Sequence, residues 1–211
     1  AQSIRRFSTS ATAAMADVSS RARVTYRDKS IDNTSVRGVT ADYVHFSSFD
    51  AERGRLMSTT EVESARPVAV IGWQTADRLF GEVDALEKSL QVNGRHFRVV
   101  GVSAKRGTIL GQSQDEFVIV PLRQFQTIFG SRRSLSLTVK PRDMSRVTQT
   151  MDEAIVALRA SRRLRPAQPE NFGVFTSDTF LDIYNQATAG IFAVLVGVVA
   201  LSLVVGGIVI M

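Results

Sequence analysis

The chain has 211 residues, of which 26 are Lys or Arg and 20 are Asp or Glu, so its formal net charge is +6. Hydrophobic residues make up 44% of it, and cysteine is absent. This balance excludes a chain that is disordered throughout, a collagen-like or disulfide-stapled fold, a thiolate metal site and a thiol nucleophile.

The N-terminal quarter predicts a helix followed by a strand pair. Residues 1–16 carry mixed signals and are expected to form a short helix that leads into the fold. Ala22, Val24 and Tyr26 alternate with the polar residues Arg21, Arg23 and Thr25, a pattern typical of a half-buried strand. Residues 35–40 are expected to form the returning strand. Residues 51–55 are expected to form a loop.

The central part predicts a buried strand, a helix and a hairpin. Residues 67–72 form a continuous apolar run, which indicates a central strand, and 75–80 fits a short helix capped by Gly81. Asn93-Gly94 separates two strand-like runs, and this dipeptide favours a type I′ turn because both of its positions need positive φ. A β-hairpin over 89–102 is therefore predicted. A short helix or turn is expected at 42–49.

The remaining polar part predicts further short elements. Strands are expected at 117–120 and 134–139, with a helix at 122–129 between them, and a longer helix is expected from about 142 to 159. A last short strand is expected at 172–175. Short strands alternating with short helices predict an α+β fold with mixed or antiparallel sheets.

The C-terminal segment differs in kind from the rest of the chain. Residues 183–211 contain no Asp, Glu, Lys, Arg or His, and Ser202 is the only residue with a polar side chain among the last 23. A helix of that length spans ~34 Å, enough for a hydrocarbon core of about 30 Å. We therefore predict two parts, an extracytoplasmic domain over 1–182 and a transmembrane helix within 183–211. The alternative for this segment is a buried core helix.

Small residues recur along the predicted membrane helix and indicate a face on which another helix could pack. These candidates are Ala189, Ala193, Gly197, Ser202 and Gly206. The chain opens on Ala1 and stops within the apolar run, so we expect it to be a fragment of a longer membrane protein.

The sequence lacks the usual signatures of catalysis. It has no phosphate-binding loop and no Gly-x-Ser-x-Gly elbow, and His45 and His96 are its only histidines. No catalytic residue, cofactor or metal site is predicted. The basic cluster at 159–165 could attract acidic partners, phospholipid headgroups or nucleic acid, but a solvated helix end is the preferred interpretation, and nucleic-acid binding is disfavoured because no aromatic-interleaved basic motif accompanies it.

Several short motifs follow one another in a fixed order along the chain. They are Gly38-Val39-Thr40 with Asp42-Tyr43, Gly54-Arg55, the run at 67–72, Leu79-Phe80-Gly81, the run at 97–102, and Gly111 to Pro121. This ordered set resembles the MacB-type ABC exporter permeases. The tail at 201–211 is similar to the start of an FtsX-like permease module. Residues 1–20 match poorly, and Asp84 to Lys88 departs from the usual turn of the family.

The resemblance implies a non-catalytic extracytoplasmic domain inserted between the first and second membrane helices of a bacterial inner-membrane permease. Its implied partners are membrane lipid, a nucleotide-binding ATPase subunit or domain, a second permease in a homodimer or heterodimer, and a periplasmic adaptor. The implied function couples ATP-driven motion to extrusion of a drug, peptide or lipoprotein. The alternatives are a membrane-anchored sensor or ligand-binding module and a membrane-anchored hydrolase.

One loop is the candidate contact region for a partner. Residues 105–116 are polar and contain glycine, and such loops on a rigid scaffold often carry recognition. The candidate residues are Lys105, Arg106, Gln112, Asp115 and Glu116.

Overall fold

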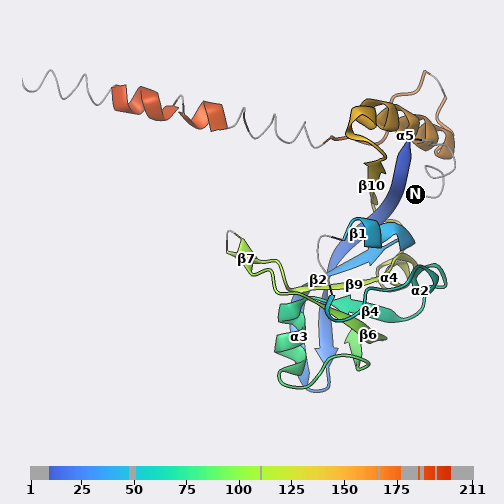
Figure 1. Ribbon diagram of the computed structural model, residues 1–211, viewed down its shortest axis with the longest axis vertical. Coiled ribbons are helices and arrows are strands. Elements are labelled where there is room, and N and C mark those ends of the chain that lie inside the picture. The colour runs from blue at the N-terminus through green and yellow to red at the C-terminus, as the bar shows by residue number, and fades with distance from the viewer. Residues whose placement is uncertain are drawn as a thin grey trace, which may run out of the picture. The chain divides into compact units, whose positions relative to one another are not determined.

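A computed structural model of the chain describes its polar part and a piece of its apolar segment (Figure 1). The described residues are 10–47, 51–109, 111–165, 167–176, 185, 188–192 and 194–200. The chain divides into two compact units, Ala1–Arg162 and Arg163–Met211.

The first unit is built on one mixed sheet. Its strand order is β10-β1-β2-β9-β4-β6-β3, and β5 pairs with both β1 and β6. The β2–β9 and β4–β6 pairs are parallel and the other pairs are antiparallel, so the predicted α+β fold with a mixed sheet is confirmed. The strands are β1 Ala11–Tyr26, β2 Lys29–Val39, β3 Ala51–Gly54, β4 Val68–Ile71, β5 Ser89–Val92, β6 Arg95–Ser103, β9 Phe117–Pro121 and β10 Ser136–Pro141.

Short helices and a small separate hairpin complete this unit. The hairpin joins β7 Thr108–Ile109 to β8 Gln112–Ser113. The helices are η1 Ala41–His45, α2 Thr59–Glu63, α3 Trp73–Phe80, α4 Leu122–Phe129, η2 Met144–Arg146 and α5 Val147–Ser161.

The central strand β4 faces a core on each side of the sheet. Ala69 and Ile71 belong to the larger apolar cluster, which includes residues of α3 and α4, and Val68 and Val70 belong to a second cluster with residues of η1 and α2. Because side chains alternate across a strand, a strand with both faces covered reads as a continuous apolar run. This explains the run at 67–72.

The long strand β1 joins two parts of the first unit. Sixteen residues at about 3.3 Å each span about 50 Å. Its second half pairs with β2 and β5, whereas Ala11–Asp17 pairs with β10. We call Ala11–Asp17, β10, η2 and α5 the α5 lobe. A small cluster around Ala14 and Ala157 packs this lobe.

Ser10 ties the start of the described chain to the same lobe. Its hydroxyl donates to Glu153 at 2.7 Å and accepts from the Thr150 hydroxyl at 2.9 Å, and both partners belong to α5. The Arg142 backbone N–H donates to the Ser10 carbonyl at 2.8 Å. Ser10, where the described chain begins, and Arg162, where the first unit ends, therefore both lie at the α5 lobe.

The predicted hairpin is confirmed, and so are the central strand and the helix before Gly81. Asn93 and Gly94 have φ of 46° and 82°, as the type I′ turn requires. Gly81 follows α3 with φ of 60°. The helix at 122–129 and the strand at 117–120 are also confirmed.

Several expected elements are wrong. Residues 11–16 form strand, not helix, because they pair with β10 and are covered on both faces, with Ala14 in one cluster and Met15 in another; residues 1–9 lie outside the described residues. The loop at 51–55 is the edge strand β3, paired with β6. The helix expected from 142 begins at Val147, after η2, and residues 172–175 form bends and irregular chain, not a strand.

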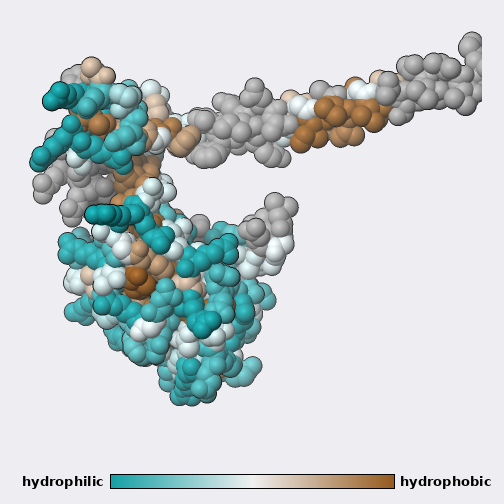
Figure 2. All heavy atoms as spheres, turned by 180° about the vertical axis from the view of Figure 1, so that it is seen from behind, coloured by the Kyte–Doolittle hydropathy of each residue, from teal (hydrophilic) through white to brown (hydrophobic). Residues whose placement is uncertain are grey.

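The second unit includes helical residues within 188–200 that expose apolar side chains, as the hydropathy view shows (Figure 2). Of the packing candidates, Ala189 and Gly197 are helical, and Ala193, Ser202 and Gly206 fall outside the described residues. Across the part of the chain that the structure describes, no helix combines the length and apolar character needed to span a membrane.

Candidate functional site

The candidate contact loop joins β6 to β9 and carries the β7–β8 hairpin, which projects away from the sheet (Figure 1). Thr108 pairs with Ser113, and Ile109 pairs with Gln112. Gly107 and Gly111 have φ of 88° and 78°, a region that residues with a Cβ rarely adopt. The glycines that punctuate this loop in the sequence therefore bend it into a hairpin.

Asp115 anchors the hairpin at its base. Its side chain accepts the backbone N–H of Arg106 at 2.9 Å and that of Gly107 at 2.7 Å, and the residue is 2% exposed. The Ser113 hydroxyl accepts the backbone N–H of Asp115 at 3.1 Å. A buried carboxylate needs such donors to offset its lost hydration.

The same residue holds the loop to the start of α3. The Asp115 carbonyl accepts the backbone N–H of Gln74 at 3.1 Å, one of the donors that the first turn of a helix leaves unpaired. A Cβ on Gly72 would lie 2.1 Å from this carbonyl oxygen, so only glycine allows the approach. The Ser113 and Gln74 side chains are also hydrogen-bonded.

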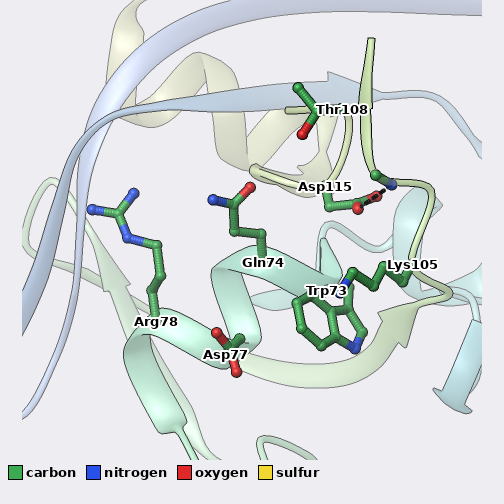
Figure 3. Close-up of a pocket in the computed structure, with 8 residues that line it drawn as sticks. Trp73, Gln74, Asp77, Arg78, Lys105, Thr108 and Asp115 are labelled. Atoms are coloured by element: carbon green, nitrogen blue, oxygen red, sulfur yellow. Dashed lines mark hydrogen bonds between the residues drawn. The ribbon is translucent and has the colours of Figure 1, made fainter. Parts of the chain in front are cut away.

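A shallow polar pocket of about 240 Å³ lies between this loop and α3 (Figure 3). The Lys105 ammonium lies 4.1 Å from the centre of the Trp73 ring, a cation–π contact. Arg78 forms an ion pair with Glu116 at 2.6 Å. The pocket is lined by Trp73, Gln74, Asp77, Arg78, Lys105, Gly107, Thr108 and Asp115.

The structure brings the predicted contact residues into one loop but gives them different environments. Lys105 and Arg106 are exposed on the loop, Glu116 is paired with Arg78, and Asp115 is buried and positions the loop. Gln112 lies in β8.

Sequence reasoning missed the contribution of α3 to this site. Trp73 is the only tryptophan in the chain and directly follows a glycine at the end of a buried strand. A large aromatic residue at the first position of a helix, next to such a glycine, was the available signal.

A second pair of charged side chains lies at α2, whose Val62 belongs to the second apolar cluster. Arg55 forms a bidentate pair with Glu61, both N–O distances being 2.7 Å. Glu61 also accepts the Ser58 backbone N–H at 2.9 Å, and the Ser58 hydroxyl accepts that of Glu61, which makes a capping box at the start of α2. The Arg55 guanidinium lowers the pKa of the Glu61 carboxyl to about 2, against the opposing effect of burial.

The two histidines lie apart from this pocket. His96 is on the hairpin, where its ring nitrogens lie 3.3 Å from the Ser89 hydroxyl and the Gln91 amide, and His45 is exposed at the end of η1. Among the residues that the structure describes, no group of three or more metal-ligating side chains comes together.

Comparison with known proteins places the chain among transporter components. A family model described as a MacB-like periplasmic core domain matches residues 1–156. The macrolide export ATP-binding/permease protein MacB of Bdellovibrio bacteriovorus is 31% identical over 195 residues, which are 92% of this chain and 30% of that protein. The MacB protein of Rhodospirillum rubrum is 31% identical over 189 residues, 88% of this chain and 28% of that protein. The chain thus spans less than a third of the length of these relatives.

Two solved structures share the fold. The periplasmic region of MacB from Actinobacillus actinomycetemcomitans superposes with a TM-score of 0.71 at 20% identity, over 87% of this chain and 81% of that one. The extracellular domain of the noncanonic ABC-type transporter YknZ gives a TM-score of 0.67 at 21% identity, over 79% of this chain and 85% of that one.

Proposed function

Because the chain belongs to the family of MacB-like periplasmic core domains, we propose that it is the extracytoplasmic part of an ABC exporter permease in a bacterial inner membrane. Residues 1–182 face the periplasm, and the apolar segment within 183–211 is the start of a membrane helix. Two observations carry this proposal: the family model matches residues 1–156, and the last 29 residues contain no Asp, Glu, Lys, Arg or His.

The path of the chain supports an insertion between two membrane helices. Ser10 is hydrogen-bonded to α5, and the chain leaves the first unit at the end of α5. Both borders of the described first unit therefore lie at the α5 lobe, and the turn at Arg27 lies at the other end of β1.

The proposed mechanism is mechanical. A nucleotide-binding ATPase on the cytoplasmic side closes a permease dimer, and the motion reaches the periplasm through the connections at the α5 lobe. The strand β1 carries it over about 50 Å, because one continuous strand belongs to both the lobe and the main sheet. The cargo is a drug, peptide or lipoprotein, which the domain passes on with a periplasmic adaptor.

The β7–β8 hairpin is the proposed contact with the adaptor or cargo. It projects from the sheet, its base is fixed by Asp115, and the adjoining pocket offers Lys105 and Trp73 to a partner. Fixing the base reduces the ordering cost that a flexible loop meets on binding.

The test uses the absence of cysteine from the chain. Thr108→Cys is introduced into the full transporter, from which any other cysteines are removed. One sample of intact cells is labelled with a membrane-impermeant maleimide, and a separate unlabelled sample is treated with a thiol-to-amine crosslinker that can join the cysteine to the adaptor. Labelling without membrane disruption is expected, together with a crosslink at Thr108→Cys that is absent from the matched exposed variant Arg21→Cys. Labelling only after lysis contradicts the periplasmic placement, and equal crosslinking of the two variants contradicts the hairpin contact.

A further inference from the structure

The Lys105 side chain covers an aromatic ring in the pocket beside α3. Its ammonium lies 4.1 Å from the centre of the Trp73 ring, and Figure 3 shows the side chain reaching from the loop to the ring on the helix. The face of an aromatic ring attracts cations because it carries the negative part of the ring quadrupole. The Trp73 face is therefore a place where an ammonium group binds, and Lys105 supplies that group from within the chain.

The cation–π contact is the only interaction that holds the Lys105 ammonium there. Within the described part of the chain, no carboxylate lies at ion-pair distance from it, and it donates no hydrogen bond. Lys105 is exposed, and its charge sits on a flexible four-carbon stem. A cation–π contact at an exposed site is weak, so the ammonium of Lys105 can be exchanged for another cation.

The charges of the loop at 105–116 and of α3 favour a cation in this place. The two segments carry six charged side chains, which are Asp77, Arg78, Lys105, Arg106, Asp115 and Glu116. Three are acidic and three are basic, so the set has a net charge of −1 when Lys105 is left out. A cationic ligand that displaces Lys105 therefore restores neutrality, whereas an anionic ligand would meet an excess of carboxylates.

One of these carboxylates is placed to assist. The Glu116 carboxylate is paired with Arg78 at 2.6 Å, and that of Asp115 is buried on backbone N–H groups. Asp77 is exposed, lines the pocket and has no ion pair among the described residues. It follows Trp73 by four positions on α3, a spacing that puts two side chains side by side on a helix. A cation on the Trp73 face thus has a carboxylate next to it.

We propose that the Trp73 face, with Asp77 beside it, is a binding site for the ammonium group of a ligand, and that Lys105 is its built-in competitor. The ligand's ammonium takes the place of the Lys105 ammonium, which moves out into water. This inference names the chemistry of the contact at the hairpin and rests on the proposed function for the bearer of the ammonium group, the cargo or the adaptor. Lys105 keeps the ring covered until such a group arrives.

The experiment follows the indole N–H signal of Trp73 by nuclear magnetic resonance. The 211-residue chain contains no other tryptophan, so the signal is unique in micelles of an uncharged detergent. The chain is titrated with choline and, separately, with dimethylbutanol, in which carbon replaces the charged nitrogen of choline. We expect choline to shift the signal to saturation and dimethylbutanol to leave it in place, because the ring attracts the charge.

The competitor is tested with Lys105→Met, which keeps a long side chain and removes the charge. We expect choline to bind about two- to fivefold more tightly, because the ligand no longer displaces an exposed cation–π contact. Lys88→Met changes the net charge equally at an exposed position outside the pocket, and we expect it to leave the affinity unchanged. An unchanged melting temperature shows that each variant is folded, and Lys105→Gln replaces Lys105→Met if the latter is not.

The carboxylate is tested with Asp77→Asn, which we expect to weaken choline binding by up to about fivefold. A second titration uses a blocked Gly-Lys-Gly peptide in place of choline. A shift of the Trp73 signal by the peptide indicates that the bearer is a basic side chain of a protein partner. A shift by choline alone indicates a small quaternary amine. Both results support an ammonium site and separate its two sources.

The proposal is overturned if choline and dimethylbutanol shift the signal alike, since the pocket would then recognise shape and not charge. It is also overturned if Lys105→Met binds choline no better than the natural chain, or if Lys88→Met strengthens binding as much. A crosslink at Thr108→Cys without choline binding refutes the ammonium site and leaves the proposed function standing. Choline binding without that crosslink refutes the hairpin contact and leaves the ammonium site standing.

Discussion

At the scale of single residues, Asp115 links three parts of the candidate site. Its carboxylate holds the backbone of Arg106 and Gly107, and its carbonyl meets the start of α3. In Asp115→Asn an amide N–H₂ group replaces one acceptor oxygen beside these backbone donors. We expect the free energy of unfolding to fall by about 1–3 kcal/mol, because buried donors lose their partner.

Chemical denaturation of the transporter's extracytoplasmic domain measures this loss, and limited proteolysis reports whether residues 105–113 loosen. The neighbouring Glu116→Gln is the control, because its partner Arg78 is about half exposed and such pairs contribute about 0–1 kcal/mol. An Asp115→Asn variant as stable and as protease-resistant as the control would contradict the anchoring role.

Glu61 gives a prediction about pH. Its pKa in the folded protein is about 2, below the unfolded value of 4.5. Its stabilising effect is therefore fully present above pH 4.5 and is lost as the pH falls toward 2. Because its partner Arg55 is half exposed, we expect about 2 kcal/mol in all.

The free energy of unfolding, measured against pH, checks this for the natural chain and for Glu61→Gln. The glutamine keeps the capping box with Ser58 but loses the ion pair. We expect the variant to be less stable at pH 7 and its curve to be flatter between pH 4.5 and 2. If the stability curves of the natural chain and of Glu61→Gln run parallel between pH 4.5 and 2, protonation of Glu61 is not the cause of the loss of stability at low pH.

At the scale of elements, the β5–β6 hairpin depends on the conformation of its turn. Gly94 has φ of 82°, and a Cβ there would have nothing within 4 Å. Gly94→Val therefore tests conformation without steric contact, and we expect it to cost about 1–2 kcal/mol. Gly94→Asn, which tolerates positive φ, is expected to cost less than half as much. Thermal unfolding of both variants measures the difference, and equal costs would show that packing governs the turn.

Elements with a local signal were predictable from the sequence, and those fixed by distant pairing were not. The Asn93-Gly94 dipeptide predicts its turn, and the continuous apolar run predicts β4, without reference to any distant residue. By contrast, residues 51–54 become strand only because β6 lies beside them, and 11–16 only because β10 does. The loop at 105–116 was found, but the part of α3 in the site depends on contacts between residues about 40 positions apart.

At the scale of the whole first unit, the two ends of β1 differ in their packing. The main sheet has two large apolar clusters, whereas the α5 lobe relies on Ala14, Ala157 and a few half-buried neighbours. Regions with few buried apolar contacts open more readily. We expect backbone amides of β10 and α5 to exchange with deuterium well before those of β4 and β6, as mass spectrometry of peptides would show. Exchange of α5 as slow as that of β4 would indicate that the unit opens only as a whole.

The hydrogen bonds of Ser10 to α5 have a consequence for protein engineering. Thr150, its partner, lies eleven positions before the end of α5, a separation of about 16 Å along the helix. The points of attachment at the two borders of the unit are thus separated by only a few helical turns. Transplanting Ser10 to Arg162 into an exposed loop of an unrelated carrier protein would need short spacers alone, and such a chimera would present the unit in water, free of lipid.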